Sequence, residues 1–203
     1  MRSTRRHGPL RAGFTLIEML IALSVLALVI VNVTSLVRTA GRAFDSDAAN
    51  ARLEEVATRT MDRVLYALAG ASRTSLTPAN EMPLSNSLIN YQTSLGIDAG
   101  VPIFGDPERI ELEPANGIVR WTRSVGTADQ KSVAWGDLVR ALNQGEVESN
   151  LWDDNENGLV DEAGLSFALI GENSVRVELS LERKSESGKQ VLFALESRVT
   201  CRN

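Results

Sequence analysis

Two apolar patterns follow one another in the first third of the chain. From Phe14 to Val33 nearly every residue is apolar, and about twenty helical residues span roughly 30 Å, the hydrocarbon thickness of a bilayer. Further on, apolar residues recur at a spacing of three and four with charged residues between them: Leu53, Val56, Ala57, Met61, Val64, Leu65 and Leu68. That spacing is typical of an amphipathic helix. No Pro lies between Leu10 and Thr77, so we expect one helix over residues 14–69.

The second half of the chain predicts strands. Two short apolar segments flank Pro114-Ala115-Asn116-Gly117 and predict a hairpin, and two long segments with strict alternation flank a turn at Ser185-Glu186-Ser187-Gly188 and predict another. The expected strands are 109–113, 117–123, 132–135, 165–170, 174–183 and 190–200. Residues 71–107 are rich in Pro and Gly, so we expect a variable loop there with little regular structure. The predicted fold class is α+β, with one long helix on an antiparallel β-meander.

Composition and charge limit the classes of function that the chain can have. The chain has 203 residues, of which 43% are hydrophobic, enough for one packed domain. Four arginines (2, 5, 6 and 11) precede the first acid, Glu18, and without residues 1–13 the chain has 17 basic and 26 acidic side chains. Such an acidic body argues against nucleic-acid binding, whereas the basic end before an apolar run is expected to stay cytoplasmic.

The chain holds few residues of the types that catalysis usually requires. His7 and Cys201 are its single histidine and cysteine, which excludes an intramolecular disulfide and leaves no Ser-His-Asp or Cys-His pair beyond the N-terminal segment. The phosphate-binding glycine motifs and the nucleophile-elbow motif do not occur either. We therefore do not expect an enzyme.

Two residues distinguish the N-terminal segment from a plain signal anchor. Gly13 stands directly before the apolar run, and Glu18 interrupts the run near its start, where an acid is costly and usually functional. The stretch Arg11-Ala12-Gly13-Phe14-Thr15-Leu16-Ile17-Glu18-Met19-Leu20 resembles the class III signal of type IV pilins and type II secretion pseudopilins.

The resemblance implies how this segment is processed and used. A prepilin peptidase would cut between Gly13 and Phe14 and methylate the new amine of Phe14. Glu18 would then partner the amine of a neighbouring subunit during assembly, although the spacing of four also allows a contact with the amine of its own chain. The implied partners are other pilin or pseudopilin subunits, the peptidase and an inner-membrane assembly platform. The implied location is the inner membrane, single-pass, with a periplasmic C-terminal domain, and then the pilus or pseudopilus.

The resemblance also implies a pilin-like fold and a division of the chain. Residues 1–13 would be a cleaved leader, 14–35 the transmembrane and filament-core half of the helix, which protrudes, and 36–70 the half that packs on the domain. Residues 71–203 would form the globular β domain. The long loop and late hairpin look most like GspJ- or PilW-type minor subunits, which predicts a minor subunit, expected at the filament tip.

A second motif lies in the acidic loop, residues 151–163. Asp153, Asn155 and Asn157 alternate before Gly158, as in the opening of an EF-hand calcium loop. The backbone carbonyl of Leu159 and the side chains of Asp161 and Glu162 would complete the candidate Ca²⁺ ligands. The bidentate Glu expected at the twelfth position is replaced by Gly164, and an ordinary solvated acidic turn explains the same residues. The competing function is therefore a signal-anchored periplasmic calcium-binding module that never polymerises.

Overall fold

The computed structural model describes residues 15–147, 150–186 and 188–202. Among these it has one long helix, α1 (Leu16–Gly70), a short 3-10 helix, η1 (Arg73–Ser75), and seven strands. The chain divides into two units, Met1–Phe44 and Asp45–Asn203. Helix α1 begins in the first unit, and its residues from Asp45 onward belong to the second unit.

In the first unit, α1 is apolar on all sides. Every side chain from Thr15 to Phe44 is exposed, and among them are large aliphatic residues such as Leu20, Leu26 and Ile30, each more than half exposed. A helix that is apolar all round requires an apolar environment. By length and composition this helix could cross a membrane, with a mean hydropathy of 2.6 in its most apolar window.

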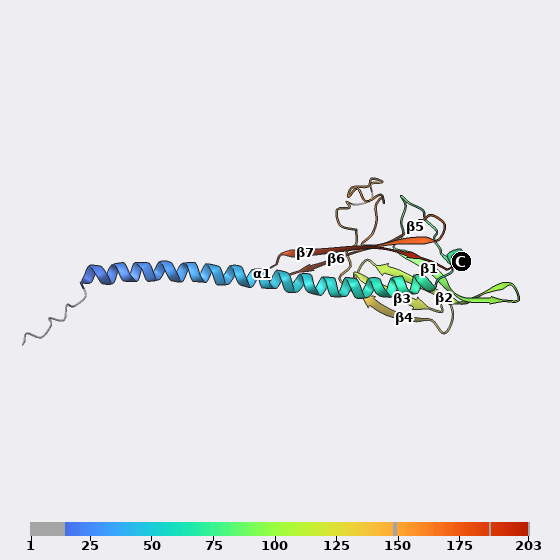
Figure 1. Ribbon diagram of the computed structural model, residues 1–203, viewed down its shortest axis with the longest axis horizontal. Coiled ribbons are helices and arrows are strands. Elements are labelled where there is room, and N and C mark those ends of the chain that lie inside the picture. Colours follow the sequence, from blue (N-terminus) through green and yellow to red (C-terminus); the bar gives the residue numbers. More distant parts are fainter. Residues whose placement is uncertain (1–14, 148–149, 187, 203) are drawn as a thin grey trace, which may run out of the picture. The chain divides into compact units, whose positions relative to one another are not determined.

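In the second unit, the strands form two antiparallel sheets, each a simple meander (Figure 1). The four-stranded sheet has the order β1 (Leu88–Asp98), β2 (Val101–Glu113), β3 (Ile118–Arg123) and β4 (Lys131–Gly136). The three-stranded sheet has the order β5 (Leu165–Ile170), β6 (Ser174–Lys184) and β7 (Gln190–Thr200). Long hairpins join β1 to β2 and β6 to β7.

The helical part of the second unit packs its apolar stripe against both sheets. Leu53 and Leu68 of α1 are fully buried, in one hydrophobic core with Ile110 of the four-stranded sheet and with Val177 and Leu179 of the three-stranded sheet. The charged residues between the stripe positions stay exposed, with ion pairs such as Arg59 to Glu55 on the outer side. The α+β class is confirmed, with the helix packed on antiparallel sheets.

Residues 71–107 differ from the loop that we expected. Strand β1 lies wholly inside this range, and β2 begins at Val101, eight residues before the expected start at 109. Ile89 and Tyr91 of β1 are buried, so the strand contributes to the core. The pattern was hidden because β1 carries register shifts around Ser94, and its outer half exposes apolar Leu95 and Ile97.

The described residues of the connection from β4 to β5, 137–147 and 150–164, cover part of the three-stranded sheet. Backbone hydrogen bonds attach it to β6: Arg140 N donates to Ser180 O at 3.0 Å, and Glu182 N donates to Leu138 O at 2.8 Å. Two charged residues of β6 are buried as a result, Arg176 and Glu178, each 5% exposed. The acidic loop therefore lies over polar side chains of a strand.

Candidate functional site

The first candidate site is the start of α1. Thr15 precedes the helix, and its backbone N and its hydroxyl both donate to Glu18 Oε2, each at 2.8 Å. Glu18 N in turn donates to Thr15 Oγ1 at 3.3 Å. This reciprocal pattern is a capping box, which satisfies backbone N–H groups that the first helical turn leaves free. Glu18 therefore has a partner within its own chain.

The role of Thr15 was not part of our prediction. A Thr followed three residues later by Glu before an apolar run is a helix-start motif, so the sequence did carry the signal. The predicted cleavage junction, Gly13 and Phe14, lies outside the described residues. The contact between the Phe14 amine and Glu18 therefore stays a prediction.

The polar residues inside the apolar stretch have their hydrogen bonds satisfied within the helix. The side chains of Ser24, Asn32 and Thr34 each donate to the carbonyl oxygen four residues earlier, at 2.8 Å. In a hydrocarbon environment every polar group must find a partner in the protein. These contacts make the helix suitable for a membrane or for the apolar centre of a filament.

The second candidate site is the acidic loop. Asp161 holds the first residues of the loop, because its carboxylate accepts hydrogen bonds from Asn150 N at 2.8 Å and Leu151 N at 2.9 Å. Asp153 shapes its tip by accepting Asn157 N at 3.0 Å and Gly158 N at 2.7 Å, and Gly158 has a φ of +90° that favours glycine. Two of the predicted ligands, Asp153 and Asp161, therefore hold the loop backbone.

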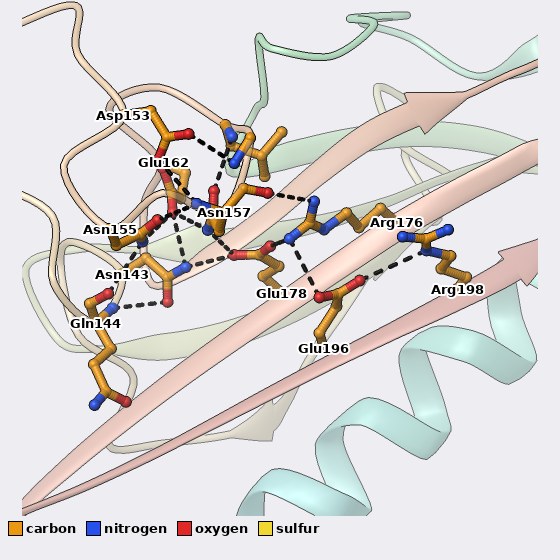
Figure 2. Close-up of polar contacts among 12 residues, drawn as sticks. Asn143, Gln144, Asp153, Asn155, Asn157, Glu162, Arg176, Glu178, Glu196 and Arg198 are labelled. Carbon is orange, nitrogen blue, oxygen red and sulfur yellow. Dashed lines mark hydrogen bonds and ion pairs between the residues drawn. The ribbon is translucent and has the colours of Figure 1, made fainter.

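The other predicted side-chain ligands meet beneath the loop. Glu162, which is fully buried, accepts three amide donors at its Oε1 atom: Asn143 at 2.9 Å, Asn155 at 2.7 Å and Asn157 at 2.6 Å (Figure 2). Leu159 is also fully buried, and its N–H donates to Asn157 Oδ1 at 2.8 Å. The structure thus brings Asn155, Asn157 and Glu162 together, but not Asp161.

Strand β6 supplies two charged members of the same cluster. Glu178 Oε2 accepts Asn157 Nδ2 at 2.9 Å and also accepts an N–H of Asn143. Arg176 forms a buried ion pair with Glu178 and donates to the carbonyl of Asn157 at 2.9 Å. It also reaches Glu196 on β7 at 3.2 Å (Figure 2).

Glu146 is the last member of the group. It is 8% exposed, and its Oε1 atom accepts Asn155 N at 3.3 Å. Burial raises the pKa of Glu146, and the nearby carboxylates of Glu162, Asp154 and Asp153 raise it further. Burial likewise raises the pKa of Glu178, against the lowering effect of Arg176. We call Asn143, Glu146, Asn155, Asn157, Glu162, Arg176 and Glu178 the buried polar cluster.

Four members of this cluster were missed from the sequence: Asn143, Glu146, Arg176 and Glu178. Arg176 and Glu178 lie on β6, where they alternate with apolar residues. Such alternation normally predicts that the polar side chains face solvent. Only the covering loop makes them interior. In the part of the chain that the structure describes, no three His, Cys, Asp or Glu side chains are grouped so that they could hold a metal ion.

Comparison with known proteins bears on the N-terminal site. Residues 9–31 match the family model of the prokaryotic N-terminal methylation motif. This match supports a type IV pilin-like or pseudopilin subunit. It covers the expected cleavage junction, the capping box and the first half of the exposed apolar helix. No curated protein and no solved structure matches the chain.

The matched motif and the exposed apolar part of α1 both point to a membrane-anchored structural subunit. A class III signal implies processing by a prepilin peptidase and assembly with other pilin subunits, which points to a structural subunit rather than an enzyme. The exposed apolar helix together with this signal fits a membrane-anchored, single-pass protein.

Proposed function

We propose that this chain is a minor pilin or minor pseudopilin, built into a type II secretion pseudopilus or a type IV pilus after its leader is removed. The observation that carries the proposal is the continuity of the motif with the helix. The methylation motif at residues 9–31 runs directly into α1, whose first part is exposed and apolar and whose second part packs on a β domain.

This arrangement suits a subunit that changes its environment. Before assembly, the exposed apolar part of α1 would lie in the inner membrane, with the arginines before it on the cytoplasmic side. After assembly, the same surface would pack against the apolar helices of neighbouring subunits. The second unit, Asp45–Asn203, would then face the periplasm or the outside of the filament.

A minor rather than a major subunit is favoured by the elaboration of the β domain. The β1–β2 hairpin exposes Leu95, Ile97 and Val101, and the connection from β4 to β5 adds the acidic loop. Every copy in a repeating shaft is surrounded by identical copies, whereas a tip subunit has room for such additions. We therefore propose a position at or near the tip.

The test is processing by the peptidase. The full-length chain is co-expressed with a prepilin peptidase, and its intact mass and N-terminal sequence are determined. We expect loss of residues 1–13, a new N-terminus at Phe14 and added mass of one methyl group. A Gly13→Leu variant is the control, and it should stay uncut because the junction requires a small residue.

The two functions that the sequence left open give different results. A pilin-like subunit is cut and methylated when the peptidase is present. A signal-anchored calcium module that never polymerises keeps its N-terminus, so an uncut wild-type chain would refute the proposal whatever the acidic loop binds.

A further inference from the structure

The charges inside the buried polar cluster do not balance. Glu146, Glu162 and Glu178 are 8%, 0% and 5% exposed, and Arg176, at 5%, is the buried cation among them. With all three carboxylates ionised, they outnumber the one guanidinium by two negative charges. Burying charges without compensation is strongly unfavourable. One divalent cation would balance the two excess negative charges.

Two carboxylate oxygens in the cluster also lack partners. Oε2 of Glu162 and Oε2 of Glu146 are both buried, and neither has a hydrogen-bond partner. Buried polar atoms are nearly always paired, so each such exception calls for an explanation. Both carboxylates contact Asn155: its backbone N lies 3.3 Å from Glu146 Oε1, and its Nδ2 lies 2.7 Å from Glu162 Oε1.

Asn155 can serve either an anion or a cation. Its side-chain amide carries donors on the nitrogen and an acceptor on the oxygen. A half-turn about the Cβ–Cγ bond exchanges the two, so that the position now held by Nδ2 beside Glu162 would present an oxygen. The exchange gives up three hydrogen bonds: the one that Asn155 Oδ1 accepts from Asn157 N at 3.0 Å, and the two that Nδ2 donates, to Glu162 Oε1 at 2.7 Å and to the Gln144 carbonyl at 3.1 Å. A cation bound by Glu162 and the turned amide oxygen would have to compensate for this loss.

We propose that the buried polar cluster is a calcium site in which Glu146, Glu162 and Asn155 supply the protein ligands. Two carboxylates and an amide oxygen are the hard oxygen ligands that Ca²⁺ prefers, and water completes a shell of six to eight. This set keeps Asn155 and Glu162 from the sequence prediction and adds Glu146. The site does not depend on assembly into a filament, so it stands apart from the proposed function.

The remaining residues explain how the site is held and reached. Asn143 and Asn157 bridge Glu162 to Glu178, and Arg176 compensates Glu178 rather than Glu162. An open cavity of about 450 Å³ borders the cluster and is lined in part by Asn143, Asn155, Asn157 and Glu178. It opens this side of the cluster, including the ligand Asn155, to solvent.

The experiment uses the full-length chain in detergent. Calcium is titrated by calorimetry, and thermal unfolding is followed by circular dichroism in calcium, in magnesium and in chelator. We expect saturable binding with a Kd in or below the range of about 10⁻⁴–10⁻³ M. Calcium at ten times Kd should raise the folded-to-unfolded ratio about elevenfold, which corresponds to a rise of roughly 3–6 °C in Tm. Magnesium should give a smaller shift, because it demands a tighter octahedral shell.

Three variants locate the site. Glu146→Gln and Glu162→Gln should each weaken calcium binding by at least about tenfold. Glu156→Gln is the matched control, since Glu156 is an exposed residue of the same loop, and it should bind like wild type. If Glu162→Gln does not fold, Glu146→Gln and the wild-type titration still decide the matter.

Two results would overturn the site. One is the absence of saturable heat and of any Tm shift in the wild type up to about 10 mM calcium, which is well above the range for extracellular modules. The other is an equal loss of binding in Glu156→Gln and Glu146→Gln, because diffuse loop charge rather than the cluster would then hold the ion.

Discussion

Gly136, the last residue of β4, lies so close to Thr60 of α1 that a Cβ atom at position 136 would fall well under 3.0 Å from the Thr60 hydroxyl. Thr60 is itself buried, and its hydroxyl donates to the carbonyl of Trp135 at 3.4 Å. Arg63, one turn further along α1, donates to the same carbonyl at 3.0 Å. The end of β4 is therefore held to the helix by two side-chain hydrogen bonds to its backbone and by close packing of Gly136 against the Thr60 side chain.

The first prediction follows from that close approach. Gly136→Ala should lower the free energy of unfolding by about 1–3 kcal/mol, because the added methyl group overpacks the contact with Thr60. Denaturant unfolding of the full-length chain in detergent measures the change. Gly41→Ala is the control: nothing lies within 4 Å of a Cβ atom there, so it should be neutral or stabilise α1 by up to about 1 kcal/mol. Equal midpoints for the two variants would contradict the close approach.

The second prediction concerns the apolar stripe of α1. Leu53 is 0% exposed and Tyr66, on the same helix, is 86% exposed. Leu53→Ala should cost about 2–5 kcal/mol, since it leaves a cavity between the helix and the sheets. Tyr66→Ala should stay within about 0.5 kcal/mol of wild type. The same unfolding measurement decides, and a larger loss for Tyr66→Ala would show that the stripe faces elsewhere.

Elements with a strong local pattern were predictable, and those that depend on distant partners were not. The α1 stripe and the β6–β7 hairpin follow from spacing alone, because Val175, Val177 and Leu179 alternate without interruption and are all buried. Strand β1 lacks such a pattern. Its pairing with β2 shifts register around Ser94, so the strand is recognised only once its partner is known.

The candidate sites show the same division. The alternation of Asp153, Asn155 and Asn157 marked the acidic loop, and the loop backbone indeed folds around these side chains. Glu146 and Glu178 join the cluster from other segments, so no local spacing connects them to the loop. The capping box of Thr15 and Glu18 is a recognisable sequence motif, whereas the resemblance to a prepilin signal implies a role only for the charge of Glu18.

The third prediction separates two roles of Glu18, as helix cap and as charge, and it rests on the proposed function. Glu18→Gln keeps an acceptor for Thr15 but removes the negative charge, whereas Thr15→Val removes the hydroxyl of the cap and keeps the charge. If the charge partners an amine within the filament, Glu18→Gln should reduce incorporation by more than about tenfold, because breaking a buried ion pair costs about 3–5 kcal/mol. Thr15→Val should lose only about 1 kcal/mol of helix stability.

Incorporation is measured as the share of the chain in the sheared filament fraction of cells that make the other subunits. Cleavage of each variant is checked by intact mass, so that a processing defect is not mistaken for an assembly defect. If Thr15→Val fails to assemble and Glu18→Gln assembles normally, the carboxylate acts as a cap and not as a charge partner.

The last prediction concerns Cys201, which is a free thiol and 5% exposed. Burial raises its pKa, although Arg73 lowers it in part. The thiolate is the reactive form, so the folded chain should react slowly with a thiol reagent at about pH 8 and fast once unfolded.

The raised pKa of Cys201 also predicts how stability depends on pH. Because the folded state holds the thiol proton to higher pH than the unfolded state, the thiol's contribution to stability is fully present below the unfolded pKa of about 8.5 and is lost as the pH rises through the folded pKa. Unfolding free energies of wild type and Cys201→Ser, compared between about pH 7 and pH 10, isolate this contribution from other titrating groups. The difference between the two proteins should shrink as the pH rises, and a constant difference together with fast thiol reaction in the folded chain would show that Cys201 is accessible to solvent.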